Sequence, residues 1–215
     1  QTVQQRALAQ FGRRALEGDG PDALLQRAAT AAAEVLNANF TAVLERTPGS
    51  QDLLLRAGAG WPDEPAGRAA FEAGAISQAG YTLLTSAPVA VEDLSNETRF
   101  SGADLLRDCG AAGGLTVIIG DASHPFGVLG AFWKTRRRIS DGELDFLESL
   151  AGLLATAIER RRTEENLRSI QLKEAEEKIR KLNEDFERRV ARRTAELAAL
   201  NEELELRNRE VERAS

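Results

Sequence analysis

The spacing of apolar residues changes once along the chain, near residue 150. Before that point, short apolar runs are separated by glycine, proline and polar residues. After Gly152, the last glycine, neither glycine nor proline occurs, and single apolar residues recur three and four positions apart. The first pattern is typical of a globular domain with strands and short helices, and the second predicts one long helix.

The globular part predicts helices and strands in a mixed order. The segment "TPGSQ" between two apolar runs indicates a β-hairpin, and "DASHP" joins two further strands. An order without regular strand–helix alternation favours an α+β fold with a mostly antiparallel sheet. The expected helices are 3–16, 23–37, 76–84 and 102–109, and the expected strands are 39–46, 52–60, 88–94, 114–120 and 126–134.

The long helix has a clear predicted start. "SDGE" (140–143) fits a capping box, in which Ser140 accepts from a backbone N–H and Glu143 reaches back to the cap. The first turns are broadly apolar as far as Ile158, as expected where a helix packs on a globular body. At 1.5 Å per residue, a helix from the capping box to the C-terminus would span roughly 110 Å.

Beyond Ile158 the apolar face narrows to a seam with the seven-residue repeat of a coiled coil. One register runs through Leu172, Ala175, Ile179, Leu182 and Phe186, and a second through Val190, Arg193, Leu197, Leu200, Leu204, Arg207 and Val211. The step between the registers is four residues instead of three, a stutter that locally unwinds a supercoil. A helix cannot bury such a stripe on itself, so we expect a partner helix. The alternative is a single solvated helix held by i,i+4 ion pairs.

Arg193 and Arg207 fall at seam positions, where burial of an unpaired guanidinium is costly. They are either ordinary imperfections or part of a marginal seam with two near-equal packings, as a bistable element requires. Our hypothesis is that a change in the globular domain rotates or re-registers the helix pair.

Charge is distributed unevenly. Residues 159–215 hold 15 Lys/Arg and 15 Asp/Glu, so the net charge of −6 lies in residues 1–158. An acidic domain argues against nucleic-acid binding, which requires a basic face. The short basic runs "KTRRR" (134–138) and "ERRR" (159–162) fit a solvated rim or partners for acidic residues near the long helix.

The single cysteine, Cys109, excludes an internal disulfide framework and suits a reducing, cytoplasmic location. No apolar run is long enough to span a bilayer, and no signal peptide is visible. The chain starts with Gln and has no Met, so we expect it to be part of a longer protein.

Several segments, in order and at ordinary distances, resemble a GAF domain of the bacterial signalling type. They are "PVAVEDL", "TRF", "HPFGVLGAFW" and "DFLESLAGLLATAIERRRTEENLR", and the resemblance covers about residues 5–168. The tail "RRVARRTAELAALNEELELRNREVERAS" is similar to the coiled-coil linker of sensor histidine kinases.

This resemblance implies a GAF-like sensory domain over residues 1–158 and a coiled-coil signalling helix over 159–215. The expected fold is α+β, with a six-stranded antiparallel sheet flanked by helices, a small-molecule pocket on one side and parallel dimerisation through the terminal helices. The phosphoacceptor histidine and the kinase core of a two-component system would follow Ser215, so this chain itself would not be an enzyme. The implied dimer residues are Ile158, Leu172, Ile179, Leu182, Phe186, Val190, Leu197, Leu200, Leu204 and Val211. Alternatives are a diguanylate cyclase or another output enzyme after residue 215, or a ligand-free structural adaptor that only dimerises.

The family pocket would be walled by the loop with Trp61 and by "EDLSNETRF" (92–100). Its apolar lining would be Trp61, Phe71, Tyr81, Phe100, Leu105 and Cys109, and Asp93 and Arg99 would orient a ligand. The alternative is that these residues only pack the loops over the sheet. The ligand is unknown and no cofactor is evident. A cyclic nucleotide is unsupported, because the longer polar motif of cyclic-nucleotide-binding members is not found.

Two further residues could bind a cofactor. In bilin-binding relatives of the family a cysteine carries the chromophore and is often followed by His. Gly110 follows Cys109 here, so a buried structural thiol is preferred to chromophore attachment. His124 could ligate haem or a metal, but it stands beside Pro125 in a predicted turn without a ligand cluster, so we expect no metal site.

Overall fold

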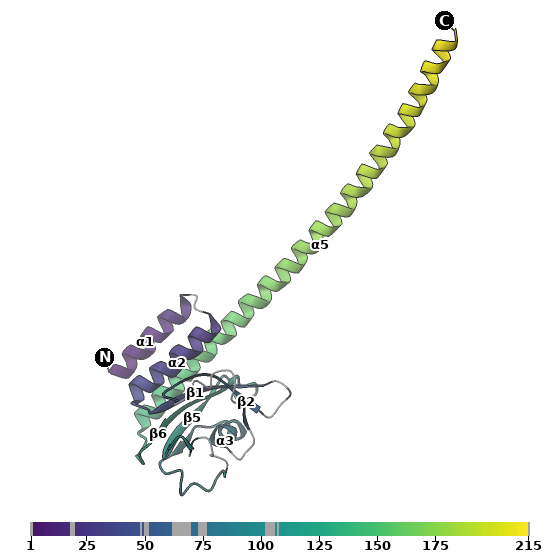
Figure 1. Ribbon diagram of the computed structural model, residues 1–215. Coiled ribbons are helices and arrows are strands. Elements are labelled where there is room, and N and C mark those ends of the chain that lie inside the picture. Colours follow the sequence, from purple (N-terminus) through teal and green to yellow (C-terminus); the bar gives the residue numbers. More distant parts are fainter. Residues whose placement is uncertain are drawn as a thin grey trace. The chain divides into compact units, whose positions relative to one another are not determined.

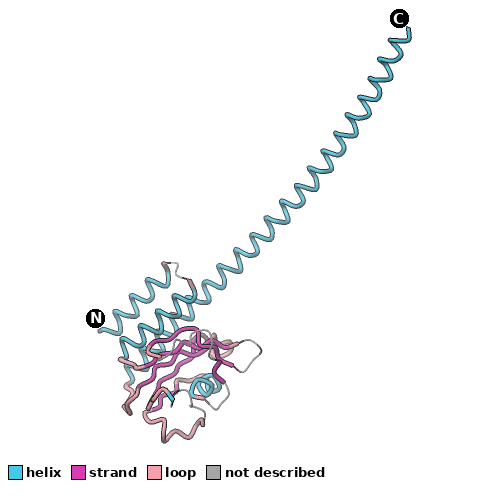
Figure 2. The backbone as a smooth tube through the Cα atoms, viewed as in Figure 1, coloured by secondary structure: helices cyan, strands magenta, loops and turns pink. Residues whose placement is uncertain are grey.

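The computed structural model describes residues 2–17, 20–47, 49, 52–61, 70–72, 77–101, 106 and 108–214. Its helices and strands follow one another in a mixed order, as the sequence predicts, with one additional strand, Ala70–Glu72, that was not among the expected elements (Figures 1 and 2). They are α1 (Val3–Leu16), α2 (Pro21–Leu36), β1 (Phe40–Arg46), β2 (Asp52–Ala59), β3 (Ala70–Glu72), α3 (Gln78–Thr85), β4 (Val89–Val91), β5 (Gly113–Ile119), β6 (Gly127–Trp133) and α5 (Asp141–Ala214). The short helix predicted at 102–109 lies mostly outside the described residues.

The described strands form one antiparallel sheet in the order β3-β2-β1-β6-β5-β4. β1 and β6 are central and pair with each other from Phe40 opposite Phe132 to Glu45 opposite Gly127. The expected α+β fold with an antiparallel sheet and a long C-terminal helix is therefore confirmed.

Each face of the sheet carries its own hydrophobic cluster because side chains alternate along a strand. Leu129, Ala131 and Trp133 of β6 face α2 and the first turns of α5, where α1 also packs through Phe11. Val128 and Phe132 of the same strand face the opposite way, toward α3 and the loop after β4. Figure 1 shows α1, α2 and the start of α5 gathered on one side of the sheet and α3 on the other.

The alternation is interrupted once, in β2. Val43 of β1 pairs with Ala57, but the next residue, Leu44, pairs with Leu55, so Arg56 is the extra residue of a β-bulge. As a result Leu55 lies in the cluster on the α3 side while Ala57 lies in the cluster on the α2 side. The Arg56 side chain pairs with Glu45 on β1, and its Nη2 lies 2.6 Å from Asp22 Oδ1 on α2.

α5 starts with the predicted capping box. The Ser140 backbone N–H donates to Glu143 Oε2 at 2.9 Å, and Ser140 Oγ accepts from the Glu143 backbone N–H at 3.4 Å. Leu147, Leu150 and Leu154 are fully buried in the cluster on the α2 side. The helix continues unbroken to Ala214, whereas the chain divides into two units, Gln1–Arg161 and Arg162–Ser215. None of the helices in the described part of the chain is long and apolar enough to cross a membrane.

Candidate functional site

The predicted pocket residues lie on the α3 side of the sheet, beside the cluster formed by Phe40, Leu55, Leu94, Phe132 and their neighbours. Trp61, Tyr81 and Cys109 are partly buried and pack against this cluster, and Phe100 belongs to it with 5% exposure. The structure therefore brings these four onto one face. The side chains of Phe71 and Leu105 lie outside the described part of the chain.

Tyr81, Phe100 and Arg99 form one contact group. The Tyr81 and Phe100 ring centroids are 6.1 Å apart, and the Arg99 guanidinium lies 5.9 Å from the Tyr81 centroid. Arg99 Nη2 also donates to the Ala90 carbonyl of β4 at 2.9 Å. Arg99, which is predicted to orient a ligand, thus lies over the ring of Tyr81, which is predicted to line the pocket. This geometry allows a cation–π contact.

Glu97 holds Arg99 in place, which sequence reasoning did not foresee. Its Oε1 accepts from the backbone N–H groups of Thr98 and Arg99, and its Oε2 pairs with Arg99 Nη2 at 2.6 Å. The side-chain hydrogen bonds from Arg99, aided by the backbone N–H groups and the guanidinium charge, outweigh burial and lower the pKa of Glu97 to about 2. The carboxylate is therefore ionised at neutral pH and keeps Arg99 from turning freely toward solvent.

Trp61 lies elsewhere on the same face, at the end of β2. Its Nε1 donates to the Thr41 carbonyl at 2.7 Å, and its ring lies 5.4 Å from that of Phe40. Gly58 makes this position possible, because a Cβ there would lie 2.7 Å from both Trp61 Nε1 and the Thr41 oxygen. Trp61 is thus fixed to the sheet by a hydrogen bond and an aromatic contact.

Asp93 organises the loop of residues 92–100, which we call the wall loop. Its Oδ1 accepts from the Ser95 N–H at 3.0 Å and from Ser95 Oγ at 2.6 Å, and its Oδ2 accepts from Asn96 Nδ2 at 2.7 Å. These bonds, the Ser95 hydroxyl foremost, lower the pKa of Asp93, and Arg136 adds to the effect. Asp93 is occupied in building the loop, so its predicted role in orienting a ligand has no direct support.

The structure describes both residues that were considered as cofactor ligands, Cys109 and His124. Cys109 is a free, partly buried thiol beside the α3-side cluster. His124 is exposed in the turn between β5 and β6, with Nδ1 3.1 Å from Ser123 Oγ. Within the described ranges, no group of three His, Cys, Asp or Glu side chains could hold a metal ion.

A buried polar cluster on the same face was missed by sequence reasoning. Thr82 Oγ1 on α3 lies 2.6 Å from Thr116 Oγ1 on β5, and Gln78 Nε2 donates to the Val89 carbonyl at 3.0 Å. Gln78 is 1% exposed, and its Oε1 has no hydrogen-bond partner among the described residues. No local pattern indicates such a cluster, because it forms only when α3 packs on β4 and β5.

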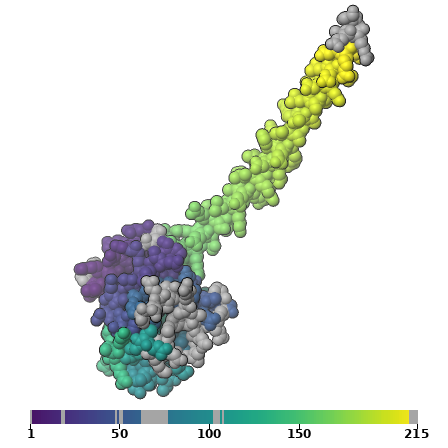
Figure 3. Space-filling model, in the orientation of Figure 1, coloured from purple at the N-terminus to yellow at the C-terminus, as the bar shows by residue number. Residues whose placement is uncertain are grey.

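A second candidate site runs along α5. Apolar side chains of the predicted seam are exposed there, from Leu172 at 57% to Leu182 at 70% and Leu204 at 51%. In Figure 3 the coloured residues of the second unit, which starts at Arg162, form a rod one helix thick. Ile158 differs from the others, since it packs partly against the α2-side cluster of the globular unit. The Val211 side chain lies outside the described part.

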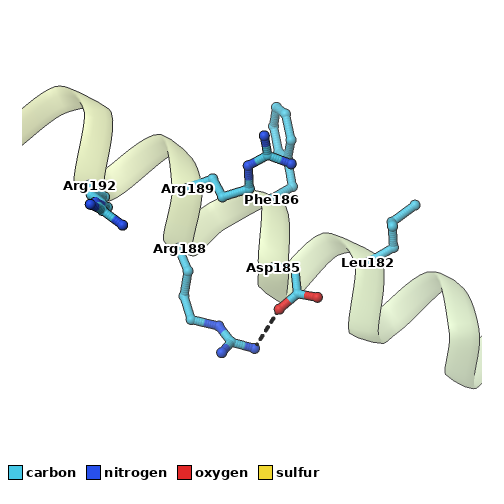
Figure 4. Close-up of a pocket in the computed structure, with 6 residues that line it drawn as sticks. All are labelled: Leu182, Asp185, Phe186, Arg188, Arg189 and Arg192. Carbon is cyan, nitrogen blue, oxygen red and sulfur yellow. Dashed lines mark ion pairs between the residues drawn. The ribbon is translucent and has the colours of Figure 1, made fainter.

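The stutter region combines this apolar stripe with arginines. Figure 4 shows Leu182, Phe186 and Arg189 projecting from one side of α5, while Asp185 and Arg188 form an ion pair of 2.9 Å on another. Further along, Arg193 Nη1 lies 3.4 Å from Glu196 Oε2, so an intrahelical carboxylate partly compensates this seam arginine. Such exposed pairs each contribute about 0.3–0.5 kcal/mol at most and leave the apolar stripe uncovered.

Solved structures share this fold at low sequence identity. The GAF domain of a phosphoenolpyruvate-protein phosphotransferase from Acinetobacter is 18% identical over 77% of this chain and 99% of its own, with a TM-score of 0.66. The free methionine-R-sulfoxide reductase from Neisseria meningitidis, in complex with its substrate, is 16% identical over 75% and 92%, with a TM-score of 0.64. A phycocyanobilin-bound GAF domain from a cyanobacterial phytochrome is 18% identical over 76% and 98%, with a TM-score of 0.62.

No curated protein matches the chain. The family model of the GAF domain, by contrast, matches residues 20–158, which include all the strands of the sheet and the first turns of α5. The likeness to solved structures supports the fold alone, but the family model covers most of the sequence. The chain belongs to the GAF domain family.

Proposed function

We propose that the chain is the sensory and dimerisation module of a sensor histidine kinase. In this proposal the GAF domain takes up a small molecule on the α3 side of its sheet, and α5 relays the resulting change to a kinase core that follows residue 215. The similar structures include GAF domains from a phosphotransferase and from a phytochrome, and part of a methyl-accepting chemotaxis protein, which supports a role in signal transduction.

The observation that carries the proposal is that one unbroken helix belongs to both units. α5 contributes Leu147, Leu150 and Leu154 to the core of the GAF domain and then extends from residue 162 as a helix with an apolar stripe. A change in the packing of its first turns must therefore be accommodated within the same helix that carries the stripe. A displacement at one end of a helix is carried along it because i→i−4 backbone hydrogen bonds link each turn to the next.

The stripe supports pairing with a second copy of the chain. Exposed Leu172, Leu197 and Leu204 recur at coiled-coil spacing, and burial of each such side chain stabilises a complex by about 1.5–3 kcal/mol. The resemblance to kinase linkers favours the parallel arrangement. A parallel pair in register also places the stutter between Phe186 and Val190 at the same level in both helices. The apolar seam positions before and after the stutter then stay opposite each other.

Sedimentation equilibrium of the 215-residue chain tests the dimer, and a monomer at high micromolar concentration would overturn it. The kinase assignment has a separate test. The longer protein incubated with labelled ATP should acquire an acid-labile phosphate on histidine after residue 215. A cyclic dinucleotide made from GTP instead would identify the output as a diguanylate cyclase and would reject the kinase.

The proposed pocket can be tested with Trp61, which the sequence predicts as part of its wall. Tryptophan emission and the melting temperature of the chain should change in the presence of a bound small molecule, and Tyr81→Ala should abolish the change. If no member of a broad metabolite panel produces a shift, the chain acts as a dimerising adaptor without a ligand, and the sensory part of the proposal falls.

A further inference from the structure

Three consecutive arginines follow β6 and lead into α5, in the linker of residues 134–140. They are part of the basic run that the sequence suggests as a solvated rim or as partners for acidic groups near the long helix. The structure places two of them, Arg136 and Arg137, in contact with different parts of the GAF domain. Their side chains therefore bridge elements that are distant in the sequence.

Arg136 contacts the wall loop. Its Nη1 lies 3.1 Å from Asp93 Oδ2, and its Nη2 donates to Ser95 Oγ at 2.8 Å. These are the two residues that build the turn of the loop, and the Leu94 between them is buried in the α3-side cluster. A shift of the wall loop on the sheet would therefore displace the Arg136 guanidinium directly.

Arg137 contacts the start of α5. Its guanidinium lies 4.7 Å from the centroid of the Trp133 ring and pairs with Glu143, the capping-box carboxylate. The other oxygen of Glu143 accepts from the Ser140 N–H and from Ser140 Oγ, both at 2.9 Å. Arg137 therefore helps to hold the group that closes the first turn of the helix.

We propose that Arg136 and Arg137 couple the wall loop to the first turn of α5. One peptide unit of about 3.8 Å separates their Cα atoms, so displacement of one contact strains the other. This coupling deepens the proposed function and rests on it, since it gives the route by which a ligand in the proposed α3-side pocket would act on the signalling helix. Both arginines act as positioning residues and need not touch a ligand.

The test loosens the loop without touching either arginine. Asn96→Ala removes the 2.7 Å hydrogen bond from Asn96 Nδ2 to Asp93 and leaves the Arg136 contacts in place. Amide hydrogen exchange of the full 215-residue chain then reports on both ends of the link. The reporters are Ser95 and Asn96 in the loop, and Glu143 and Leu144, whose N–H groups both donate to the Ser140 carbonyl at 3.1 Å.

The expected result is that Asn96→Ala accelerates exchange at Glu143 and Leu144 about two- to fivefold, in keeping with the strength of partly exposed ion pairs. In an Arg136→Gln or Arg137→Gln background, the same substitution should accelerate exchange in the loop only. Arg138→Gln is the matched control, because that side chain is 93% exposed and its Nε lies 3.9 Å from Glu92 Oε1. It should leave the response of α5 unchanged.

An equal α5 response in the Arg136→Gln background, or none in any background, would overturn the link. Far-UV circular dichroism and Trp133 emission verify that each variant is folded. The outcome is independent of the oligomeric state and of the output enzyme, because every reporter lies within residues 92–144. A monomeric chain would reject the proposed dimer and leave this coupling standing.

Discussion

Thr82 Oγ1 and Thr116 Oγ1 lie 2.6 Å apart, and both side chains are fully buried between α3 and β5. Thr82 Oγ1 also donates to the Gln78 carbonyl at 2.9 Å, and Thr116 Oγ1 lies 3.4 Å from the Val89 carbonyl. This polar contact attaches α3 to the sheet on the face where we place the ligand.

Thr116→Val should lower the free energy of unfolding by about 1–3 kcal/mol, since it removes a partner of a buried hydroxyl. The double variant with Thr82→Val should cost less than the sum of the single changes, because the contact between the two hydroxyls can be lost only once. Urea denaturation measures both. Thr85→Val is the control, as its hydroxyl makes the same backbone contact at an exposed position of α3. Strict additivity of the Thr82 and Thr116 changes would contradict the coupling.

Gly58→Ala should destabilise the GAF domain by about 1–3 kcal/mol, because its Cβ would lie 2.7 Å from Trp61 Nε1 and the Thr41 oxygen. Trp61 emission should shift toward longer wavelength as the ring is displaced from Phe40. Gly152→Ala in α5 is the opposite case, since nothing lies within 4 Å of its added Cβ. That change should raise stability by about 0.5–1 kcal/mol, as expected for alanine in a helix. A neutral Gly58→Ala would mean that Trp61 is not held as described.

Glu97 makes the wall loop sensitive to acid. The folded-state pKa of about 2 lies below the usual 4.5, so this carboxylate stabilises the folded state above pH 4.5, and the stabilisation is lost as the pH falls toward 2. The stability difference between the wild type and Glu97→Gln should be on the order of 1–2 kcal/mol at pH 6 and should vanish near pH 2. Urea denaturation from pH 6 to pH 2 measures this difference. A difference that is constant with pH would show that the carboxylate charge is not responsible.

Substitutions along α5 separate seam positions from merely exposed ones. Leu197→Ser combined with Leu204→Ser should raise the dissociation constant of the proposed dimer at least a hundredfold, from the lost burial of two leucines on each helix. Leu206→Ser is the matched control, because Leu206 is 58% exposed but lies outside the seam register. Analytical ultracentrifugation measures the dissociation constants of the wild type, the double variant and Leu206→Ser. An equal effect of Leu206→Ser would place the interface on a different face.

Removal of the seam arginines should act in the opposite direction. Arg193→Leu with Arg207→Leu fills the seam with apolar side chains, so the melting temperature of the dimer should rise. In the intact parent, signalling output should become fixed in one state, because a stronger seam has one preferred packing. An output that still responds normally to the stimulus would contradict a role for a marginal seam.

Local patterns predict much of this fold and less of its candidate site. The capping box at Ser140 and Glu143 and the turn signals of the hairpins were sufficient to place α5 and the main strands, because caps and turns depend on neighbours in the sequence. The bulge at Arg56, the contact of Glu97 with Arg99, and the Gln78 cluster were not predicted. The bulge and the Gln78 cluster arise from tertiary packing that a single sequence does not encode locally. Glu97 and Arg99 are only two residues apart, but they lie in an irregular loop, where no periodic pattern predicts which side chains pair. Ile158 shows the same limit, since its spacing fits the seam while its surroundings belong to the GAF core.

The extra residue in β2 has an evolutionary consequence. Deletion of Arg56 would turn the bulged strand into a regular one and still leave Leu55 and Ala57 facing the layers they face now. Loss of that codon would remove the charge that ties Asp22 to Glu45 but would not invert the strand. Deletion of Leu55 would instead remove a fully buried side chain of the α3-side core. Relatives of this chain are therefore expected to vary in length at residue 56 more readily than at its neighbour.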